Sequence, residues 1–373
     1  MMNSVMHVQS SIKDFYYKKH DHFYCCYLTP YRNLGELWPM FGAIKKYINF
    51  DTIVVPYDKI KFDPNYNKFS LDDHLEYASH SGMFVFIDKL NEHIHDEKDF
   101  DELFTNLKKH NLLQKCVVID GTKNEYLFEK HGVPHFYFPG MIWFYLMNTK
   151  IPAYVAQPNN QFLCLNNYHK PHRLASIITL DQQKLLKRTA WSYRQPIDGD
   201  LQGMTKIIPN FNLGMLTMDI PKYLDQTPDK FVQSLNMEKL YGDAMATIVT
   251  ETDYFFEHIV YASEKTYNAI FYGTVPILVS TPNSINVLRE HSIDVYDDII
   301  DHSYDEEVNP IKRFEKISET IEMVGSFRQY GQIRSILASR ILRNQILIND
   351  ATHWIKETEH YGEKFFMENK ISI

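Results

Sequence analysis

The sequence predicts an α/β fold in two lobes, and three features of the chain support that prediction. Short apolar runs rich in β-branched and aromatic residues alternate with longer amphipathic stretches, which is typical of parallel sheets covered by helices. The length of 373 residues is too great for one ordinary hydrophobic core. A stretch containing Pro and Asn, "PAYVAQPNN" (152–160), interrupts the alternation and marks the boundary between the lobes.

The first lobe is expected to hold several buried strands. The runs that predict them lie at 23–30, 51–58, 83–88, 115–120 and 135–139. A helical pattern dotted with charges, at 99–111, falls between two of these runs. Asp88 and Asp120 each end a strand, and the carboxyl ends of strands are where open parallel sheets gather their ligands.

The second lobe repeats the alternation of strands and helices. Strands are expected at 161–165, 189–194, 246–252 and 274–280, and helices at 174–187, 265–273 and 284–292, before a mostly helical end from about 312. The predicted organisation is an N-terminal α/β lobe at 1–155, a C-terminal α/β lobe at 160–330, and helices at 331–373 that pack across the lobes. The last helix is expected to return to the first lobe.

Composition narrows the class of protein. The net charge of −8 and the pI of about 6.1 argue against a surface coated with basic residues, although a local basic groove stays open. Neither a zinc-ligand spacing nor a disulfide framework is visible among the four cysteines, and Cys116 and Cys164 lie in strand-like runs as expected of buried thiols. The N-terminus lacks the apolar core of a signal peptide, and the run "MIWFYLM" (141–147) is too short to cross a bilayer. These features predict a cytoplasmic protein without membrane insertion.

Glycine is scarce, with 14 residues, and neither G-x-x-x-x-G-K-[ST] nor G-x-G-x-x-G occurs in the chain. A P-loop kinase and a standard dinucleotide-dependent dehydrogenase are therefore disfavoured. Two Rossmann-like lobes without a glycine fingerprint suit nucleotide-sugar glycosyltransferases of the B fold (GT-B), with the ligand cleft between the lobes. Periplasmic-type binding proteins share this plan, but they require export.

The loop between the first strand and the first helix of the second lobe is rich in donors and cations. Its polar residues are Asn166, Asn167, His169, Lys170, His172 and Arg173. Such residues, at the carboxyl end of a strand and the amino end of a helix, suit a phosphate. Arg173 adjoins the apolar face of the helix and would be costly to bury unpaired. A solvated turn that carries positive charges is the alternative, and the sequence leaves both interpretations open.

The stretch "YASEKTYNAIFYGTVPILVS" (261–280) raises a second question about charge. Ser263 can cap a helix, Glu264 suits its first turn, and Gly273 suits the position after its end. Lys265 is unexpected, because the helix macrodipole disfavours a cation in the first turn. A diphosphate at this helix start would account for Lys265, while Glu264 could accept hydrogen bonds from ribose hydroxyls. Arg173 and Lys265 would then hold a nucleotide diphosphate from two sides without a metal.

Three segments of the second lobe resemble glycosyltransferases of phage, viral and bacterial genomes that are related to fucosyltransferases and exostosin-like enzymes. They are "FLCLNNYHKPHR", "VTETDYFFEHIVYASEKTYNAIFYGTVPILV" and "VYDDIIDHSYDEEVNP", and the resemblance covers roughly 161–194 and 246–310. It implies that the donor nucleotide sugar is contacted by matching residues of this chain. These are Asn166 and Arg173, Thr250 and Glu251, Glu264 and Lys265, with Asp301, Tyr304 and Asp305 in a later matching segment. Together with His172 and Ser263 from the loop and the cap, the first six form the predicted donor site.

A metal-dependent alternative has candidates in the sequence. The D-x-D pattern occurs as "DFD" (99–101) and "DGD" (198–200), but neither follows an apolar strand. The runs "HDH" (20–22) and "HIH" (93–95) lack a third ligand at a sensible spacing. The prediction is that no metal and no further cofactor take part, and that the nucleotide-diphosphate sugar is the donor substrate.

Inverting transfer needs a base that takes the proton of the acceptor hydroxyl. Asp120 is the preferred candidate and Asp88 the second, although either residue could merely end its strand and cap a turn. The sequence therefore predicts a metal-independent, inverting glycosyltransferase whose acceptor is either a glycan or a hydroxymethylated base in double-stranded phage DNA. The alternative from another class is a non-catalytic protein that binds a sugar nucleotide or a glycan.

Overall fold

A computed structural model describes residues 52–56, 69–81, 84–89, 97–139, 142, 151–194, 201–224 and 237–369. The chain divides into two compact units. The first unit comprises residues 1–143 and 351–373, and the second comprises residues 144–350. The strand expected at 23–30 lies outside the described residues.

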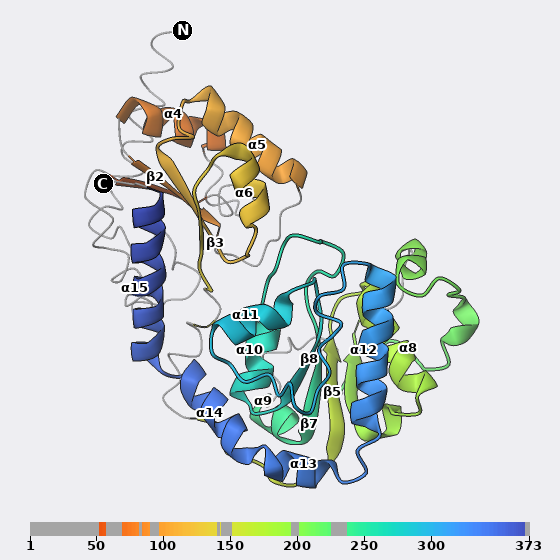
Figure 1. The fold of residues 1–373 in the computed structure, drawn as a ribbon. Helices are drawn as coiled ribbons and strands as arrows, with labels where there is room; N and C mark the ends of the chain where they lie inside the picture. The colour runs from red at the N-terminus through yellow and green to blue at the C-terminus, as the bar shows by residue number, and fades with distance from the viewer. Residues whose placement is uncertain are drawn as a thin grey trace. The chain divides into compact units, whose positions relative to one another are not determined.

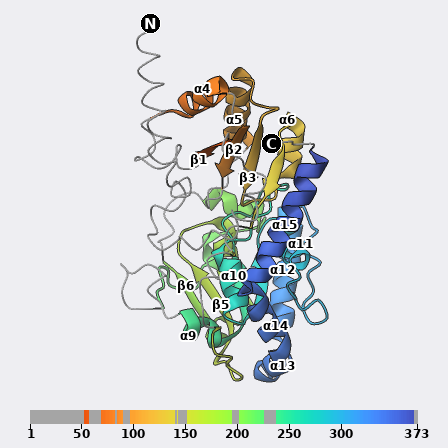
Figure 2. The same ribbon diagram turned by 90° about the vertical axis from the view of Figure 1, so that its left-hand side faces the viewer.

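The first unit contains a parallel four-stranded sheet of order β1-β2-β3-β4. Its strands are β1 (Thr52–Pro56), β2 (Phe84–Lys89), β3 (Cys116–Asp120) and β4 (His135–Tyr137). The helices that connect them are α4 (Leu71–Ser81), α5 (Glu97–Lys109) and α6 (Glu125–His131). The first three strands run side by side in Figure 2. The sheet confirms the parallel α/β arrangement that the alternating sequence pattern predicts.

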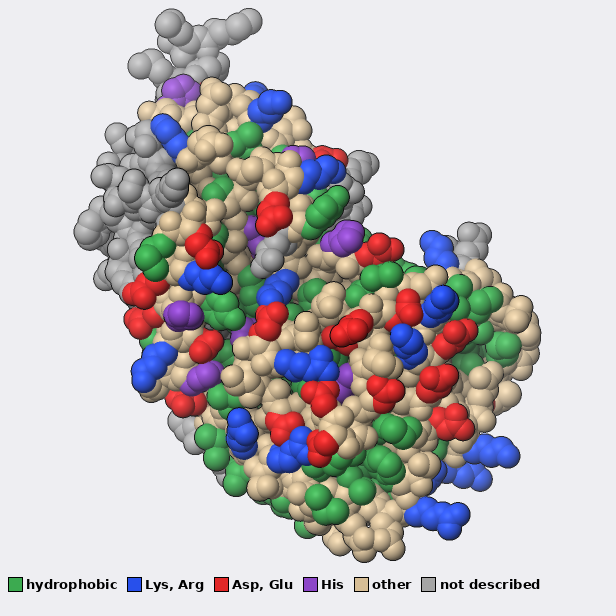
Figure 3. Space-filling view, in the orientation of Figure 1, with side chains coloured by type: hydrophobic (Ala, Val, Ile, Leu, Met, Phe, Trp, Pro, Cys, Tyr) green, Lys and Arg blue, Asp and Glu red, His purple; other side chains and the backbone are tan. Residues whose placement is uncertain are grey.

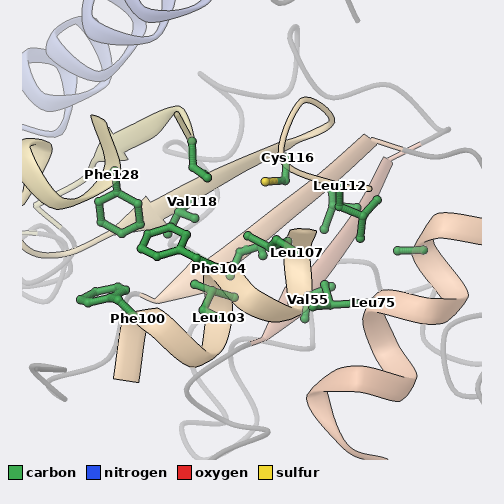
Figure 4. Close-up of a cluster of buried hydrophobic side chains, with 14 of the residues drawn as sticks. Val55, Leu75, Phe100, Leu103, Phe104, Leu107, Leu112, Cys116, Val118 and Phe128 are labelled. Carbon is green, nitrogen blue, oxygen red and sulfur yellow. The ribbon is translucent and has the colours of Figure 1, made fainter. Parts of the chain in front are cut away.

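The core of the first unit lies between one face of this sheet and its three connecting helices (Figure 4). Phe100 and Phe104 of α5 pack edge-on against Phe128 of α6, with ring centroids 5.1 and 5.6 Å apart. Cys116 and Val118 of β3 face this cluster, because alternate residues of a strand point to the same side. The burial of Cys116 raises the pKa of its thiol to about 12, as expected of an inert core cysteine.

The opposite face of the same sheet is covered by the C-terminal helix α15 (Ala351–Glu368), which belongs to the first unit. Phe136 of β4 meets Phe365 of α15 with ring centroids 5.3 Å apart. A helix that follows the second unit in sequence thus returns to the first, as the sequence predicts.

The second unit contains a parallel sheet of order β6-β5-β7-β8. Its strands are β5 (Asn160–Asn166), β6 (Thr189–Tyr193), β7 (Ala244–Thr250) and β8 (Val275–Val279). The chain leaves β5 toward β6 and then returns to add β7 on the other side of β5. The order therefore reverses between β5 and β7, and this topological switch point is where open parallel sheets bind ligands.

Helices cover both faces of the second sheet. Figure 1 shows α8 (Pro171–Gln182) and α12 (Pro310–Gly325) on one face, with α10 (Glu264–Phe271) and α11 (Ser284–Glu290) on the other. Helix α14 (Ala338–Ile348) packs on α10. The remaining helical segments are η3 (Leu186–Arg188), η4 (Leu201–Lys206), η5 (Leu213–Met215), α9 (Met237–Gly242) and α13 (Tyr330–Ile336). The predicted α/β fold class is confirmed in both units, whereas the cleft expected between the lobes stays a prediction.

Local sequence signals explain where the helices of the second unit begin and end. Pro171 is the first residue of α8, a position that needs no backbone N–H. The Ser263 Oγ accepts a hydrogen bond from the Lys265 N–H and caps α10. Gly273, with φ of 78°, follows the end of α10 in the left-handed region that favours glycine. No helix among the described residues is long and apolar enough to cross a membrane.

Candidate functional site

The carboxyl ends of β5 and β7 are joined by buried polar side chains at the switch point. The Thr250 Oγ1 donates a hydrogen bond to the Asn166 Oδ1 over 2.7 Å. The Asn166 Nδ2 in turn donates to the Cys164 Sγ over 3.4 Å. Asn166 and Thr250 are both buried, and their hydrogen bond links the ends of the two strands. Contact of either residue with a donor sugar stays a prediction.

Glu251 follows directly after β7 and is 1% exposed. Its Oε1 accepts hydrogen bonds from the backbone N–H of Ser263, over 3.0 Å, and from the hydroxyl of Thr266. Both donors belong to the start of α10. The carboxylate therefore anchors the amino end of α10 to the end of β7. The structure accounts for Glu251 without a ligand, and its predicted role as a donor contact is not tested.

Four cationic or imidazole side chains converge on residues 251–253, the segment that leaves β7. The Lys170 Nζ donates to the carbonyl oxygen of Thr252, and the Lys265 Nζ donates to the Thr252 Oγ1 over 3.4 Å. The His172 Nε2 lies 2.8 Å from the carbonyl oxygen of Glu251, to which Arg173 also donates. The β5–α8 loop and the start of α10, which are about 90 residues apart in sequence, thus contact one short segment. We call Lys170, Arg173, Lys265 and segment 251–253 the anion site.

Arg173 is the most deeply buried cation of the anion site, with 5% exposure. Among the described residues, its guanidinium donates to two backbone carbonyls, those of Tyr168 over 3.2 Å and Glu251 over 3.4 Å. The Nε is buried without a hydrogen-bond partner, and no described carboxylate forms an ion pair with the guanidinium. Burial lowers the pKa of Arg173, an effect that the nearby charge of Glu251 opposes. A buried cation without a paired anion is costly, and a bound anion would relieve that cost.

His172 lies beside Arg173 but carries no charge of its own. Because a carbonyl oxygen only accepts, the contact with Glu251 assigns the proton to Nε2. Burial holds the pKa of His172 well below its usual range, and the neighbouring Arg173 charge lowers it further. The ring also stacks on Tyr254 with centroids 5.5 Å apart. His172 therefore supports segment 251–253 as a neutral donor.

Lys265 and Glu264 are the accessible charged pair at the start of α10. The Lys265 Nζ lies 3.4 Å from the Glu264 Oε1, and the two side chains are 31% and 37% exposed. The cap residue, Ser263, is fully buried, and its Oγ accepts the Lys265 N–H over 3.1 Å. Ser263 thus acts as a helix cap, as the sequence predicts. The side chains of Glu264 and Lys265 are the most exposed of those described at this helix start.

Asp253 is a site residue that the sequence analysis missed. Its carboxylate lies 3.8 Å from the Lys170 Nζ. Burial raises the pKa of Asp253 and lowers the pKa of Lys170. The only signal in the sequence is the position of Asp253, three residues after the end of a buried strand, and that position alone does not show which lysine it meets.

The sequence also proposed a later segment, whose residues turn out to have structural contacts. The carboxylate of Asp305 accepts the N–H groups of Ile285 and Asn286 and caps α11. The hydroxyl of Tyr304 accepts the Leu278 N–H over 3.2 Å. Asp301 accepts the Ser303 N–H. These contacts fix the loop beyond β8 and explain the residues without a ligand.

The two candidate bases lie in the first unit. Asp120 ends β3 and is fully buried, and its two oxygens accept the backbone N–H and the hydroxyl of Thr122 over 2.9 and 2.7 Å. This is the turn-capping alternative stated for it above. Asp88 pairs with Ile119 through the backbone of β2, and its side chain lies outside the described part of the structure. A catalytic role for either aspartate stays a prediction.

The metal-ligand candidates are placed as follows. The "DFD" run lies in helix α5, where Asp101 is exposed on the surface. The runs at 20–22, 93–95 and 198–200 lie outside the described residues. Within the described ranges, no group of three or more His, Cys, Asp or Glu side chains could hold a metal ion. The "DFD" alternative is therefore not supported by its position.

Comparison with known proteins gives a fold-level similarity only. No protein-family model matches the chain, and no curated protein matches it. One similar solved structure is T4 phage BGT in complex with UDP and Mn²⁺, with 12% identity and a TM-score of 0.40, covering 86% of this chain and 82% of that chain. Another is the DNA-modifying enzyme β-glucosyltransferase, solved with and without uridine diphosphoglucose, with 12% identity and a TM-score of 0.42, covering 90% of this chain and 94% of that one. At this identity and these TM-scores, neither similarity is a basis for assigning an activity.

The neutral, buried state of His172 predicts a specific pH dependence of stability. Its pKa is depressed from 6.5 in the folded state, so the unfolded chain takes up a proton that the folded chain refuses. Wild-type stability should therefore be lost, relative to His172→Gln, as the pH falls below about 6.5, by up to about 1.4 kcal/mol per pH unit. Urea unfolding of both proteins between about pH 5 and 8 measures the difference. Glutamine keeps a donor for the Glu251 carbonyl but cannot be protonated, and a difference that does not change with pH would contradict the assignment.

Proposed function

We propose that the anion site binds the diphosphate of a nucleotide sugar and that the protein is a glycosyltransferase. The observation that carries this proposal is Arg173, a buried guanidinium that meets only carbonyl oxygens at the topological switch point of the second sheet. Lys170 and Lys265 add two cations on the same short segment. The start of α10 adds the partial positive charge of a helix amino end.

The carboxylates around the anion site do not replace such a ligand. Asp253 and Glu264 lie 3.8 and 3.4 Å from their lysines, and each side chain is at least a quarter exposed. Ion pairs of this length and exposure stabilise a protein by only about 0–1 kcal/mol. A bound diphosphate could therefore replace Asp253 and Glu264 as the partner of Lys170 and Lys265 with little loss of stability. It would also supply Arg173 with a counter-charge. The carboxylate of Glu264, which only accepts hydrogen bonds when ionised, is the proposed acceptor for the hydroxyls of a ribose.

The reaction that we propose is metal-independent and inverting. In the transition state, negative charge develops on the departing diphosphate, and Arg173 and Lys265 would stabilise it in place of a divalent cation. The acceptor hydroxyl must lose a proton as the anomeric carbon is attacked, and Asp120 or Asp88 is the proposed base. No further cofactor enters the proposal, because the nucleotide sugar itself is the donor.

Two classes of acceptor remain in the proposal, a glycan and a hydroxymethylated base of double-stranded phage DNA. On the face shown in Figure 3, the described Lys and Arg side chains lie among Asp and Glu side chains. This mixture of charges, together with the net charge of −8, argues against a broad nucleic-acid-binding surface on that face. A non-catalytic sugar-nucleotide or glycan-binding protein is the second candidate. Slow hydrolysis of the nucleotide sugar without an acceptor would distinguish a transferase from it.

Lys265 provides the sharpest test of catalysis. Lys265→Ala should change the free energy of unfolding by no more than about 1 kcal/mol, since a cation is lost from the positive end of a helix. Transfer, or hydrolysis of the nucleotide sugar, should nevertheless fall by about 10²-fold or more, because the leaving diphosphate loses its partner. Lys265→Arg should restore only part of the rate. The measurements are urea unfolding and initial rates.

Lys312 offers a matched control for this substitution. It also lies in a first helical turn, that of α12, its N–H is also accepted by the cap residue, and its side chain is exposed. Lys312→Ala should leave turnover unchanged. If Lys265→Ala turned over like Lys312→Ala, Lys265 would be a surface group and the catalytic proposal would be wrong.

The absence of a metal requirement is a separate prediction. Nucleotide binding and turnover should persist in excess EDTA, because three cations of the chain face the proposed diphosphate. Calorimetric titration and rate assays, with and without the chelator, measure both properties. Loss of activity on chelation that Mn²⁺ or Mg²⁺ restores would contradict the metal-independent mechanism while leaving the glycosyltransferase proposal in place.

A further inference from the structure

Arg313 of α12 is a second buried guanidinium without a carboxylate partner, and it lies outside the anion site. It is 1% exposed, and its Nη1 donates to the carbonyl oxygens of Glu307 over 2.8 Å and Val308 over 3.1 Å. Its Nη2 donates to the carbonyl oxygen of Tyr254. Its Nε is buried without a partner, and no described carboxylate forms an ion pair with it. Burial lowers its pKa, so the side chain is held in place at a cost.

Tyr254 connects Arg313 to the anion site. The guanidinium of Arg313 lies over the Tyr254 ring, 4.4 Å from its centroid. The ring of His172 also stacks on Tyr254, at an interplanar angle of 16°. The Tyr254 hydroxyl donates to the carbonyl oxygen of Pro310 over 2.6 Å. The backbone carbonyl and the side chain of Tyr254 are thereby both bound to α12, at Arg313 and Pro310.

Tyr254 directly follows segment 251–253, so the contacts of Arg313 with Tyr254 fix one end of that segment. Segment 251–253 is held at its start by the end of β7 and at its end by Tyr254. Lys170, His172 and Arg173 each contact a backbone carbonyl of this segment. The placement of those carbonyls therefore determines where the cations lie. Loss of the anchor at Tyr254 would loosen the segment at one end and so make the positions of these carbonyls less defined.

We propose that Arg313 is a positioning residue of the anion site, which fixes Tyr254 and thereby the segment on which Lys170, Arg173 and Lys265 rest. This inference depends on the proposed function, because it assumes that the anion site binds a diphosphate. Arg313 touches neither the ligand nor the reacting atoms in this account. It acts through Tyr254 and through the stack with His172.

The same unit contains a matched control, Arg334 of α13. Arg334 is also 1% exposed, donates to a backbone carbonyl, lies over a tyrosine ring (Tyr154, at 5.6 Å), and has a buried Nε without a partner. Its carbonyl partner is Ala244, the first residue of β7, whereas the anion site lies beyond the last residue of that strand. Substitution of either arginine removes a buried cation and its hydrogen bonding to backbone carbonyl oxygen, at three carbonyls for Arg313 and one for Arg334. Only Arg313 contacts Tyr254, the residue that follows segment 251–253.

The experiment compares Arg313→Met with Arg334→Met in the full chain. Thermal unfolding selects a temperature at which both variants are folded, and calorimetric titration then measures the affinity for UDP, GDP, ADP and CDP. We expect Arg313→Met to weaken the tightest of these diphosphates by at least about tenfold and Arg334→Met by no more than about twofold. Arg313→Lys should restore part of the affinity, since it keeps the charge and one donor. If a methionine variant does not fold, Arg313→Lys and Arg334→Lys make the same comparison.

The outcomes separate this inference from the proposed function. Equal affinities of the two variants, whether both are retained or both are lost, would overturn the positioning role of Arg313 and leave the anion site intact. Wild-type protein that bound none of the four diphosphates would overturn the proposed function, and this inference with it. Selective weakening in the Arg313 variants supports the inference.

Discussion

The buried carboxylate of Glu251 is the interaction on which the second unit's candidate site depends. It binds the Ser263 N–H and the Thr266 hydroxyl, and so it joins the start of α10 to the end of β7. The carboxylate accepts hydrogen bonds from these donors and does not form an ion pair with Arg173. Burial lowers the pKa of Arg173, and the nearby charge of Glu251 only partly opposes that effect. The same residue thus orders the helix start and offers its carbonyl oxygen to His172 and Arg173.

Arg173 and Arg313 are both buried, and they donate to the carbonyl oxygens of Glu251 and Tyr254 just after β7. Neither arginine has a carboxylate partner among the described residues. Replacing buried charges by apolar residues is often neutral or stabilising, so folding alone does not require them. The guanidinium of Arg313 donates hydrogen bonds to three carbonyl oxygens and lies over an aromatic ring. Apart from its Nε, these protein contacts account for it without a ligand. Arg173 has two long contacts and an unused Nε. This difference is why we assign a ligand to Arg173 and a positioning role to Arg313.

Much of the second unit follows from local sequence signals. Pro171 at the start of α8, Ser263 as the cap of α10 and Gly273 after its end act over a few residues, and the sequence predicts each of them. The sequence also indicates that Arg173 would be costly to bury without a partner, and the structure buries it. In the first unit, the sequence predicts bounds for the helical pattern at 99–111 but none for α4 or α6. The strand expected at 246–252 begins and ends two residues earlier, at 244 and 250, which places Glu251 beyond the sheet.

Contacts between distant residues are the part that the sequence could not provide. The pairing of Lys170 with Asp253 and the stacking of Arg313 on Tyr254 depend on loops brought together by the parallel sheet. The anchoring role of Glu251 could not be predicted for the same reason. The sequence shows a glutamate after a strand, but it does not show whether that glutamate binds a ligand or the start of a helix. The resemblance to glycosyltransferase motifs covers the segments that form the anion site, but it did not separate residues that hold the fold from residues that we propose to contact a ligand.

If a diphosphate is the counter-ion of Arg173, the stability of Arg173→Met should not respond to that ligand. Melting temperatures of this variant and of the wild type would be measured with and without inorganic pyrophosphate and the four nucleoside diphosphates. A ligand that binds only the folded state stabilises it by RT ln(1 + [L]/Kd). The account predicts that Arg173→Met is at least as stable as the wild type without ligand, and that ligand stabilises only the wild type. A variant that is less stable without ligand, yet is stabilised by the diphosphate as much as the wild type, would show that Arg173 serves the fold and would contradict the account.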